Sequence, residues 1–325
     1  MSKKMSKKKK KKVLILSCFS VIMLCVLTVG GVVLKAMIDV NNAMGAMYAP
    51  VKTDNLRVDS DASSPEEVTH DDLIKAKKPF SVLLLGTDTG DFGRTEKRGR
   101  SDTIIVCTVN PEQGSVKMLS IPRDTRTEIV GRGKQDKINH AYAFGGAEMS
   151  INTVQNFLGI PIDAYAVVNF AGFQKIVDAV GGVTVENTLN FSIDGYTFSK
   201  GSVELDGAKA LAYCRMRYDD PNGDFGRSER QRQVIVAIAK KALSFNSVAN
   251  YKQILDSVAD SVLTDMDFET MLDLAANYSQ CVNNVTQFPT LAGKGTKIDG
   301  IYYYIADETA LASTVAELKA HLEID

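Results

Sequence analysis

The stretch Phe80-Ser81-Val82-Leu83-Leu84-Leu85-Gly86 decides the fold class of this chain. It is a short apolar run that ends at a glycine, and such a run is typical of a β-strand buried in a sheet. Further strands are predicted over residues 103–109, 116–121, 164–170, 183–185 and 302–305, with a local hairpin over residues 196–203. Apolar periodicity and stop signals predict helices over residues 149–158, 173–180, 206–212, 224–243, 251–263, 268–278 and 308–322. Strands that alternate with helices predict a layered α/β domain.

Residues 13–34 form a stretch of 22 residues without a charged side chain. At about 1.5 Å per residue, a helix of this length crosses a hydrocarbon core of about 30 Å. Eight lysines lie within residues 1–12, and the positive-inside rule places such a block in the cytoplasm. We therefore expect a cytoplasmic polybasic tail, a single transmembrane helix and an extracellular location for the rest. A cleaved signal peptide is the alternative, but the run is longer than a usual signal-peptide core and no clear A-x-A site follows it.

Residues 35–78 are polar and mixed, with a run of acidic residues and serines at residues 59–67. This composition predicts a solvated extracytoplasmic linker, followed by a folded domain over residues 79–325. Removing the eight N-terminal lysines changes the net charge from −1 to −9. An acidic body argues against a general nucleic-acid-binding face. The five cysteines form no metal-binding pattern, so we expect buried free thiols rather than a disulfide framework, although one bridge stays open.

Four polar segments lie at the ends of predicted strands and at the start of one predicted helix. They are Gly86-Thr87-Asp88, Arg100-Ser101-Asp102-Thr103, Pro122-Arg123-Asp124-Thr125-Arg126, and a set made of Arg215, Arg217, Arg227 and Gln231. The first two members of that set are two residues apart and would share a face of an extended segment, whereas the last two would share a face of a helix. Loops beyond strand ends are where open α/β sheets bind ligands, so we expect the four segments to converge.

Carboxylates among many arginines indicate a magnesium ion and a polyphosphate. Asp88 and Asp102 have the hard oxygen ligands that such a cation prefers. Guanidinium groups bind phosphate oxygens through paired donors, and the candidates are Arg100, Arg123, Arg126, Arg215, Arg217 and Arg227, with Gln231 beside them. Phosphoryl transfer depends mainly on positioning and charge stabilisation, so no covalent nucleophile is required. One carboxylate would accept a proton from the acceptor hydroxyl, and the sequence leaves open which one.

Each of these patterns also has a purely structural explanation. The first two arginines of the set can pair with nearby carboxylates such as Asp219 and Asp220, and the helix pair can form a solvated face. The combination favours a ligand site, because like charges repel unless a shared anion lies between them. Other chemistries have little support, since the chain has no H-E-x-x-H, G-x-S-x-G or G-x-x-x-x-G-K-[ST] motif. We expect a structural role for His140.

Taken in order, these segments resemble the LytR-CpsA-Psr family of bacterial cell-envelope proteins. The matching stretches are residues 86–88, 100–103, 120–125, 137–142, 170–185 and 205–231. The resemblance covers about residues 80–243 together with the anchored topology. It implies a three-layer α/β/α fold with a mixed sheet, flanking helices and an apolar pocket for a polyprenyl chain.

The resemblance also implies an activity. Similar proteins are phosphotransferases that act outside the membrane and move a glycopolymer from an undecaprenyl-pyrophosphate carrier to peptidoglycan, with a phosphodiester formed on the muramic acid sugar. Carried over residue by residue, Asp88 and Asp102 would hold Mg²⁺ or Mn²⁺. The catalytic set would be Asp88, Asp102, Arg100, Arg123, Arg126, Arg215 and Arg217, and the pyrophosphate would be bound by Arg100, Arg123, Arg126, Arg215, Arg217, Arg227 and Gln231. The lipid pocket would be lined by Val167, Val168, Phe170, Phe173, Ile176 and Val177, which equally fit an ordinary core.

Other functions stay open. A non-catalytic protein that holds polyprenyl pyrophosphates, or an envelope regulator of the attenuator type, would use the same arginines without turnover. Pyrophosphatase or phosphodiesterase activity that releases the polymer to water would differ only in the acceptor. Direct DNA binding is disfavoured by the expected location and by the lack of a clear helix-turn-helix. Wall teichoic acid, capsule and a rhamnose-type polysaccharide are all compatible with the sequence.

Overall fold

The computed structural model describes residues 45–53, 57, 68–90, 93, 98–244 and 257–324. The predicted cytoplasmic tail, the predicted transmembrane helix and most of the predicted linker lie outside these ranges. Within them, no helix has both the length and the apolar character needed to cross a bilayer. The membrane anchor at residues 13–34 therefore stays a prediction.

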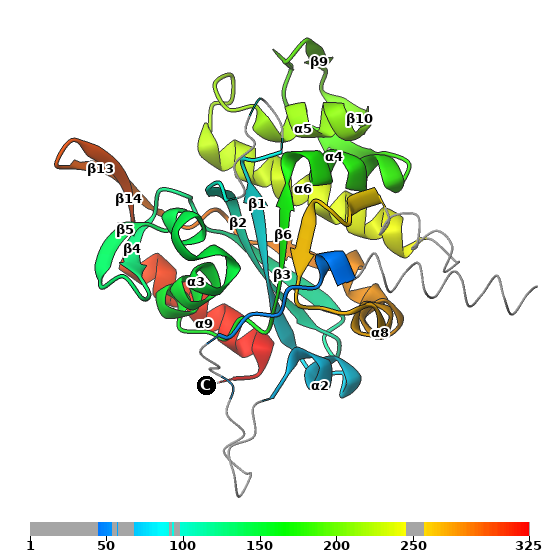
Figure 1. Cartoon of the computed structure of the whole chain (residues 1–325). Coiled ribbons are helices and arrows are strands. Elements are labelled where there is room, and N and C mark those ends of the chain that lie inside the picture. Colours follow the sequence, from blue (N-terminus) through cyan, green and yellow to red (C-terminus); the bar gives the residue numbers. More distant parts are fainter. Residues whose placement is uncertain are drawn as a thin grey trace, which may run out of the picture.

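A six-stranded mixed sheet forms the centre of the molecule (Figure 1). Its strands, in spatial order, are β11 (Val262–Thr264), β6 (Ala164–Asn169), β1 (Phe80–Thr87), β2 (Ser101–Asn110), β3 (Ser115–Ser120) and β12 (Val285–Gln287). β1 is parallel to β6 and antiparallel to β2, and Thr87 at the end of β1 pairs with Ser101 at the start of β2. The predicted buried strand is therefore central, and the residues that follow it reach the same sheet edge as the residues that open β2.

Helices cover both faces of the sheet. They are α2 (His70–Lys75), α3 (His140–Leu158), α6 (Asp224–Leu243), α8 (Phe268–Tyr278) with η1 (Ser279–Asn283), and α9 (Glu308–Leu322). Side chains alternate across a strand, so Leu83 and Leu85 of β1 pack on one face with α3 and α9. Phe80 and Val82 pack on the other face with α2, α8, η1 and part of α6. A mixed sheet between two helical layers agrees with the predicted α/β/α arrangement (Figure 1).

A smaller unit lies next to β6 and α6 at one end of the sheet (Figure 1). It consists of α4 (Phe170–Ala179), β7 (Val183–Asn187), β8 (Phe191–Ile193), β9 (Tyr196–Phe198), β10 (Gly201–Leu205) and α5 (Gly207–Arg215). Its own core contains the rings of Phe191, Phe198 and Tyr213, whose centroids are 4.8, 5.5 and 5.8 Å apart. Helices α4 and α5 approach closely, because a Cβ on Gly207 would lie 2.4 Å from the carbonyl oxygen of Gln174.

Two further hairpins lie beyond the end of strand β3. They are β4 (Arg126–Ile129) with β5 (Lys134–Lys137), and β13 (Gly293–Ile298) with β14 (Ile301–Ala306). The backbone N–H of Tyr304 donates to the carbonyl oxygen of Asp124 at 2.8 Å, and Thr125 forms a β-bridge with Tyr304. The second hairpin is therefore held next to β4, and it projects from the body there in Figure 1.

Three predicted boundaries are wrong. Helix α2 is capped by Thr69 and buries Leu73 and Ile74, so the folded domain begins before residue 79. Helix α3 begins at His140 rather than at residue 149, because Gly146 has φ 69° and ψ −150° and interrupts the helical pattern. The helix predicted over residues 251–263 gives way to strand β11, and residues 251–256 lie outside the described ranges.

The hairpin predicted over residues 196–203 is also wrong. Strand β9 pairs with β8, and β10 pairs with β7. The turn between β8 and β9 is Asp194-Gly195, with φ values of 50° and 81°. Positive φ at both central residues is the requirement of the two-residue hairpin turn that favours Asp-Gly. This dipeptide is the local signal that marks the correct pairing.

Candidate functional site

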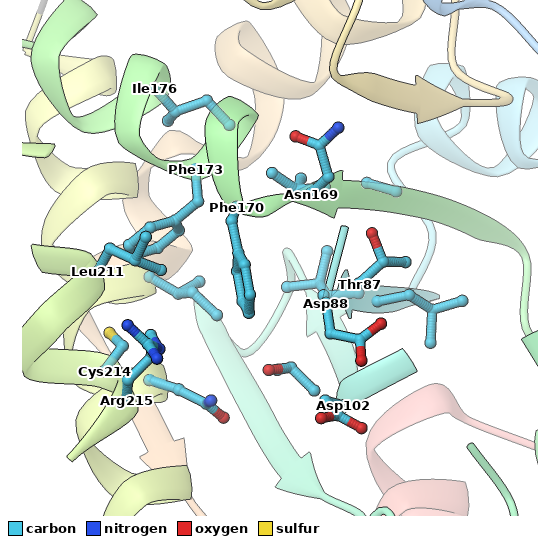
Figure 2. A pocket seen from close by; sticks show the side chains of 18 of the residues that line it. Thr87, Asp88, Asp102, Asn169, Phe170, Phe173, Ile176, Leu211, Cys214 and Arg215 are labelled. Atoms are coloured by element: carbon cyan, nitrogen blue, oxygen red, sulfur yellow. The ribbon is translucent and has the colours of Figure 1, made fainter. Parts of the chain in front are cut away.

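A cavity of about 480 Å³ lies between the sheet and helices α4, α5 and α6 (Figure 2). Strands β1, β2 and β6 supply the sheet side of it, near the edge where β1 ends. Each of the four polar segments contributes at least one residue to the lining. The lining residues are Leu84, Leu85, Gly86, Thr87, Asp88, Asp102, Thr103, Arg123, Ala166, Val168, Asn169, Phe170, Phe173, Ile176, Leu211, Cys214, Arg215, Arg227, Gln231, Ile235 and Ile238.

One part of this cavity is apolar. Phe173 and Ile176 of α4, Leu211 of α5 and Ile238 of α6 supply its helical side. Helix α4 begins directly after Asn169, whose side chain caps it by accepting the backbone N–H of Gly172 at 2.8 Å. Figure 2 shows Asp88 and Asp102 on the opposite side of the cavity from Phe173, Ile176 and Leu211. The cavity therefore has an apolar part and a polar part.

Two of the residues predicted to line a lipid pocket lie elsewhere. Val167 is buried in the core on the α3 side of the sheet, because it points to the opposite face from Ala166 and Val168. Val177 is fully buried in the core of the smaller unit, since α4 has an apolar side toward that core as well as toward the cavity. Phe170, Phe173, Ile176 and Val168 do line the cavity.

The polar part of the cavity contains two carboxylates from neighbouring strands. Asp88 directly follows β1, and its Oδ1 accepts the backbone N–H of Arg100 at 3.0 Å. Asp102 lies in β2, and its Oδ1 accepts the side-chain amide of Asn139 at 3.2 Å. The other oxygen of Asp102 forms an ion pair with Arg123. Both carboxylates are held by donors, so their positions are set before any ligand binds.

Arg123 and Arg227 differ in how their charge is balanced. Burial opposes the charge of Arg123, but the fields of Asp102, Asp224 and Asp124 outweigh it and raise the pKa of this guanidinium. Burial dominates at Arg227 and lowers its pKa, although Asp224 lies only 2.8 Å away. The Nε of Arg227 is buried and donates to none of the described residues. A bound anion would relieve this deficit, since an unsatisfied buried donor is costly.

Gln231 lies one helical turn after Arg227 on α6 and also lines the cavity. This placement agrees with the predicted helix face. Because α6 begins at Asp224, both side chains belong to its first two turns. The N-terminal end of a helix attracts anions through its free N–H groups and its dipole.

Arg215 and Arg217 do not form the predicted pair on an extended segment. Helix α5 continues through Arg215, which lines the cavity and forms an ion pair with Asp194 at 2.7 Å. Arg217 follows the helix cap at Met216, pairs with Asp224 at 3.6 Å and does not line the cavity. The apolar pattern of α5 keeps the chain helical through Arg215, so the alternating faces of an extended segment do not apply to this pair. Arg217 reaches the site only through the carboxylate that it shares with Arg227.

Arg230 is a structural residue of this region that the sequence analysis did not single out. Its guanidinium donates to the carbonyl oxygens of Tyr213 and Met216 and forms a buried ion pair with Asp220. It therefore connects α6 to the end of α5 and to the loop that contains Arg217. Asp220, which we considered as a partner for Arg215 and Arg217, pairs with Arg230 instead. No sequence signal marks this role, because the buried pairing with Asp220 is a tertiary contact.

Arg100 and Arg126 do not reach the cavity. Arg100 is exposed and contributes its backbone N–H to Asp88. Arg126 lies on β4 with its guanidinium 5.9 Å from the ring centre of Tyr303. The turn from Pro122 to Thr125, closed by a 2.9 Å backbone hydrogen bond, reverses the chain between Arg123 and Arg126. Spacing in sequence could not reveal this reversal.

The remaining predicted polar residues have structural contacts. His140 pairs through Nδ1 with Asp136 at 3.0 Å, as expected for a structural residue. Cys107, Cys214 and Cys281 are free and buried, which confirms the prediction of free thiols for these three. Burial raises the pKa of the Cys214 thiol to about 12, so this lining residue is a neutral thiol at physiological pH.

Asp88 and Asp102 are the carboxylates that line the cavity. The described residues contain no group of three or more His, Cys, Asp or Glu side chains that could hold a metal ion. Mg²⁺ commonly uses only one or two protein carboxylates and completes its shell with water and substrate phosphates. The donor set therefore fits a magnesium ion that binds together with a phosphorylated ligand.

Comparison with known proteins finds a family match and relatives of similar sequence. Residues 39–320 match the LytR_cpsA_psr family. The polyisoprenyl-teichoic acid–peptidoglycan teichoic acid transferase TagU of Halalkalibacterium halodurans is 49% identical over 286 residues, which cover 88% of this chain and 90% of that protein.

Two solved structures extend the similarity to the fold. The crystal structure of TagU from Bacillus subtilis has a TM-score of 0.63 and 46% identity, and the match covers 77% of this chain and 99% of that one. A structure of TagT bound to LI-WTA has a TM-score of 0.68 and 29% identity, and the match covers 85% of this chain and all of that one. The extent of the family match and the identity to its members establish that this chain belongs to the LytR_cpsA_psr family.

Proposed function

We propose that this chain is a glycopolymer transferase, which moves a teichoic-acid-type polymer from a polyprenyl-pyrophosphate carrier to peptidoglycan. One observation carries the proposal: a single cavity joins an apolar part to a polar part that contains Arg123, Arg227, Asp88 and Asp102. A lipid pyrophosphate has the same two halves. The names of the relatives, teichoic acid transferases that act on peptidoglycan, support this substrate class.

The two parts of the cavity would divide the binding of the donor. The prenyl units next to the pyrophosphate would lie against the apolar side chains of α4, α5 and α6. Arg227, Arg215 and Gln231 would donate to phosphate oxygens, and the pairing of Arg123 with Asp102 would hold its guanidinium at the polar part. Binding energy from the lipid would then position the phosphorus for reaction.

The proposed reaction is a displacement at phosphorus. A hydroxyl oxygen of peptidoglycan forms a new P–O bond, the P–O bond to the carrier phosphate breaks, and polyprenyl phosphate leaves. The hydroxyl proton passes to a carboxylate of the polar part or to solvent. Mg²⁺ held by Asp88 and Asp102 would stabilise charge on the phosphates. Arg123 and Arg227 would stabilise the charge that develops on the transferred group and the leaving group.

We also propose that residues 13–34 anchor the protein with its folded domain outside the cell. The supporting observations are the uncharged stretch and the lysine block before it. A carrier lipid is confined to the membrane, so an anchor raises its effective concentration near the cavity.

The test is a transfer assay with the full-length protein in liposomes, a synthetic polyprenyl-pyrophosphate glycan, Mg²⁺ and peptidoglycan. Arg123→Ala should lower kcat/KM by about 100-fold or more, because it removes a charge at the reacting phosphate. Arg132→Ala is the matched control, since Arg132 is an exposed arginine next to Phe144 and away from the cavity. Thermal unfolding of both variants shows whether they fold.

Removal of Mg²⁺ separates transfer from simple binding. With EDTA, transfer should stop while lipid retention persists, because the apolar side chains do not depend on the metal. Retention of intact donor with Mg²⁺ present and no phosphodiester product would contradict the transferase and favour a binding protein. Free polymer in place of the phosphodiester would indicate hydrolysis.

A further inference from the structure

A group of rings and cations, of which two rings are exposed and the other members are half-buried, lies beside the polar part of the cavity. We call it the Tyr302 surface, and it comprises Tyr302 and Tyr303 of β14, Arg126 of β4, Lys137 of β5 and Phe225 of α6. Tyr302 is 45% exposed and Phe225 is 43% exposed, which is high for aromatic side chains. The Nζ of Lys137 lies 5.9 Å from the ring centres of both tyrosines, and the guanidinium of Arg126 lies 5.9 Å from that of Tyr303.

Two short series of contacts link this surface to the polar part of the cavity. Lys137 forms an ion pair with Asp124 at 2.7 Å, and Asp124 follows Arg123 in the chain. The ring of Phe225 makes an edge-to-face contact with Tyr304, with centroids 6.0 Å apart. Asp224, which precedes Phe225, forms the ion pair with Arg227. One residue therefore separates the Tyr302 surface from each arginine of the polar part, Asp124 from Arg123 and Asp224 from Arg227.

In the proposed binding mode of the donor, the surface also lies on the side from which an acceptor would approach. In a displacement at phosphorus, the attacking and leaving oxygens are roughly in line on opposite sides. The leaving group of the proposed reaction is the lipid phosphate, whose prenyl units would lie between the sheet and α4, α5 and α6. Figure 1 shows the β13–β14 hairpin on the β4–β5 side of the sheet, away from α4 and α5.

The chemistry of the surface suits a sugar polymer with carboxylates. Exposed tyrosine rings stack on the apolar faces of pyranose rings, and their hydroxyls bond to sugar hydroxyls. Arg126 has no carboxylate within ion-pair distance among the described residues, so its guanidinium is available to an anionic group. Two further cations, Lys294 and Lys297, are exposed on the neighbouring strand β13. The combination matches the amino-sugar strand and the carboxylate-bearing stem peptides of peptidoglycan.

We propose that the Tyr302 surface binds the acceptor glycan strand of peptidoglycan. The proposal rests on the proposed function, and it adds which face of the molecule receives the acceptor. The polymer of the donor is the competing occupant, since it is also anionic. The in-line geometry favours the acceptor, because the carrier phosphate and the acceptor oxygen must lie on opposite sides of the phosphorus.

The test compares variants of the full-length protein in detergent or liposomes. Tyr302→Ala combined with Arg126→Gln should raise the KM for uncrosslinked peptidoglycan strands about tenfold or more and leave the KM for the lipid-linked donor unchanged. Tyr302→Phe should stay close to the unchanged protein, because it keeps the ring. Tyr48→Ala is the matched control, since Tyr48 has the same exposed fraction of 45% next to β11, at the other edge of the sheet.

A second readout does not depend on transfer. Purified peptidoglycan stripped of other polymers should retain the unchanged full-length protein on sedimentation and retain the Tyr302/Arg126 double variant at least fivefold less. If the double variant loses this binding and the unchanged protein shows no transfer, the proposed function is overturned and the acceptor surface is kept. Transfer with both KM values and the sedimentation unchanged would overturn the acceptor surface alone. A raised KM for the donor with an unchanged KM for the acceptor would assign the surface to the donor polymer instead.

Discussion

His321 lies in the last helix with both ring nitrogens in hydrogen bonds. Its Nδ1 is 2.7 Å from the hydroxyl of Thr108, and its Nε2 is 2.9 Å from the hydroxyl of Ser115. The side chain is 1% exposed, and its backbone oxygen accepts the side-chain amide of Asn110 at 2.9 Å. This histidine therefore attaches α9 to both β2 and β3, and the position of α9 depends on a neutral ring.

Acid should weaken the fold through this residue. Burial, with a further contribution from Lys117, lowers the pKa of His321 from 6.5 to about 4. The unfolded chain therefore binds a proton that the folded chain excludes between these values. The contribution of His321 to the free energy of unfolding is fully present above about pH 6.5. It falls as the pH drops toward 4, by an amount on the order of a few kcal/mol.

Urea unfolding between pH 4 and pH 7.5 measures this dependence. His321→Gln keeps a group that hydrogen-bonds and does not titrate, so its free energy of unfolding should change less over the same interval. His70→Gln removes a histidine that is paired with Asp71 outside this core and is the control for general acid effects. Equal pH dependence in all three proteins would show that His321 does not contribute.

At the scale of elements, the contact between α4 and α5 sets the shape of the cavity. Gly207 opens α5, and its N–H donates to Asp178 of α4 at 2.7 Å. A methyl group at this position would meet backbone and carboxylate atoms of α4 within 2.4–2.8 Å. Because backbone atoms cannot rotate away, the two helices would have to separate.

Gly207→Ala should therefore destabilise the protein by roughly 1–3 kcal/mol, the usual cost of overpacking. The lowered stability would appear in urea unfolding, and donor retention should fall with it, since α4 and α5 both line the cavity. Gly45→Ala is the control, because no atom of the described residues lies within 4 Å of a Cβ there. Unchanged stability of Gly207→Ala would mean that the helices separate without cost.

The ion pair of Arg230 and Asp220 connects α6 to the loop after α5. Their side chains are only 7% and 2% exposed. Arg230→Met leaves the Asp220 carboxylate buried and unpaired, so we expect a loss of roughly 3–5 kcal/mol. Adding Asp220→Asn removes that charge, and the double variant should recover part of the loss. A double variant as unstable as the single one would show that the hydrogen bonds of Arg230 to backbone carbonyls matter more than the charge pair.

At the scale of the whole molecule, the sequence predicts regular features well and chain reversals poorly. The apolar run of β1 and the amphipathic α6 have strong local patterns, and both lie where they were expected. The order of the polar segments along the strands also indicates that Asp88, Asp102, Arg123 and Arg227 meet. Each of these residues follows or opens an element whose type the sequence determines.

Three of the residues that were expected at the site and lie elsewhere share one physical cause. Arg126 leaves the site through a tight turn, Arg217 lies beyond a helix cap, and Val167 points to the other face of its strand. A change of one residue in register or one turn reverses the direction of a side chain. Arg230 was missed for a related reason, since only the tertiary contact with Asp220 distinguishes it from a solvated arginine.

The apolar side of the cavity bears on how the protein would meet a lipid-linked donor. About 480 Å³ is within the range of sites for drug-sized ligands, roughly 300–1,000 Å³. The apolar side chains of α4, α5 and α6 would take the place of lipid tails around the prenyl units of the proposed donor. Because both surroundings are apolar, the chain would pass from the bilayer into the cavity without a large cost in free energy, and the α4–α6 side of the domain would face the membrane during loading.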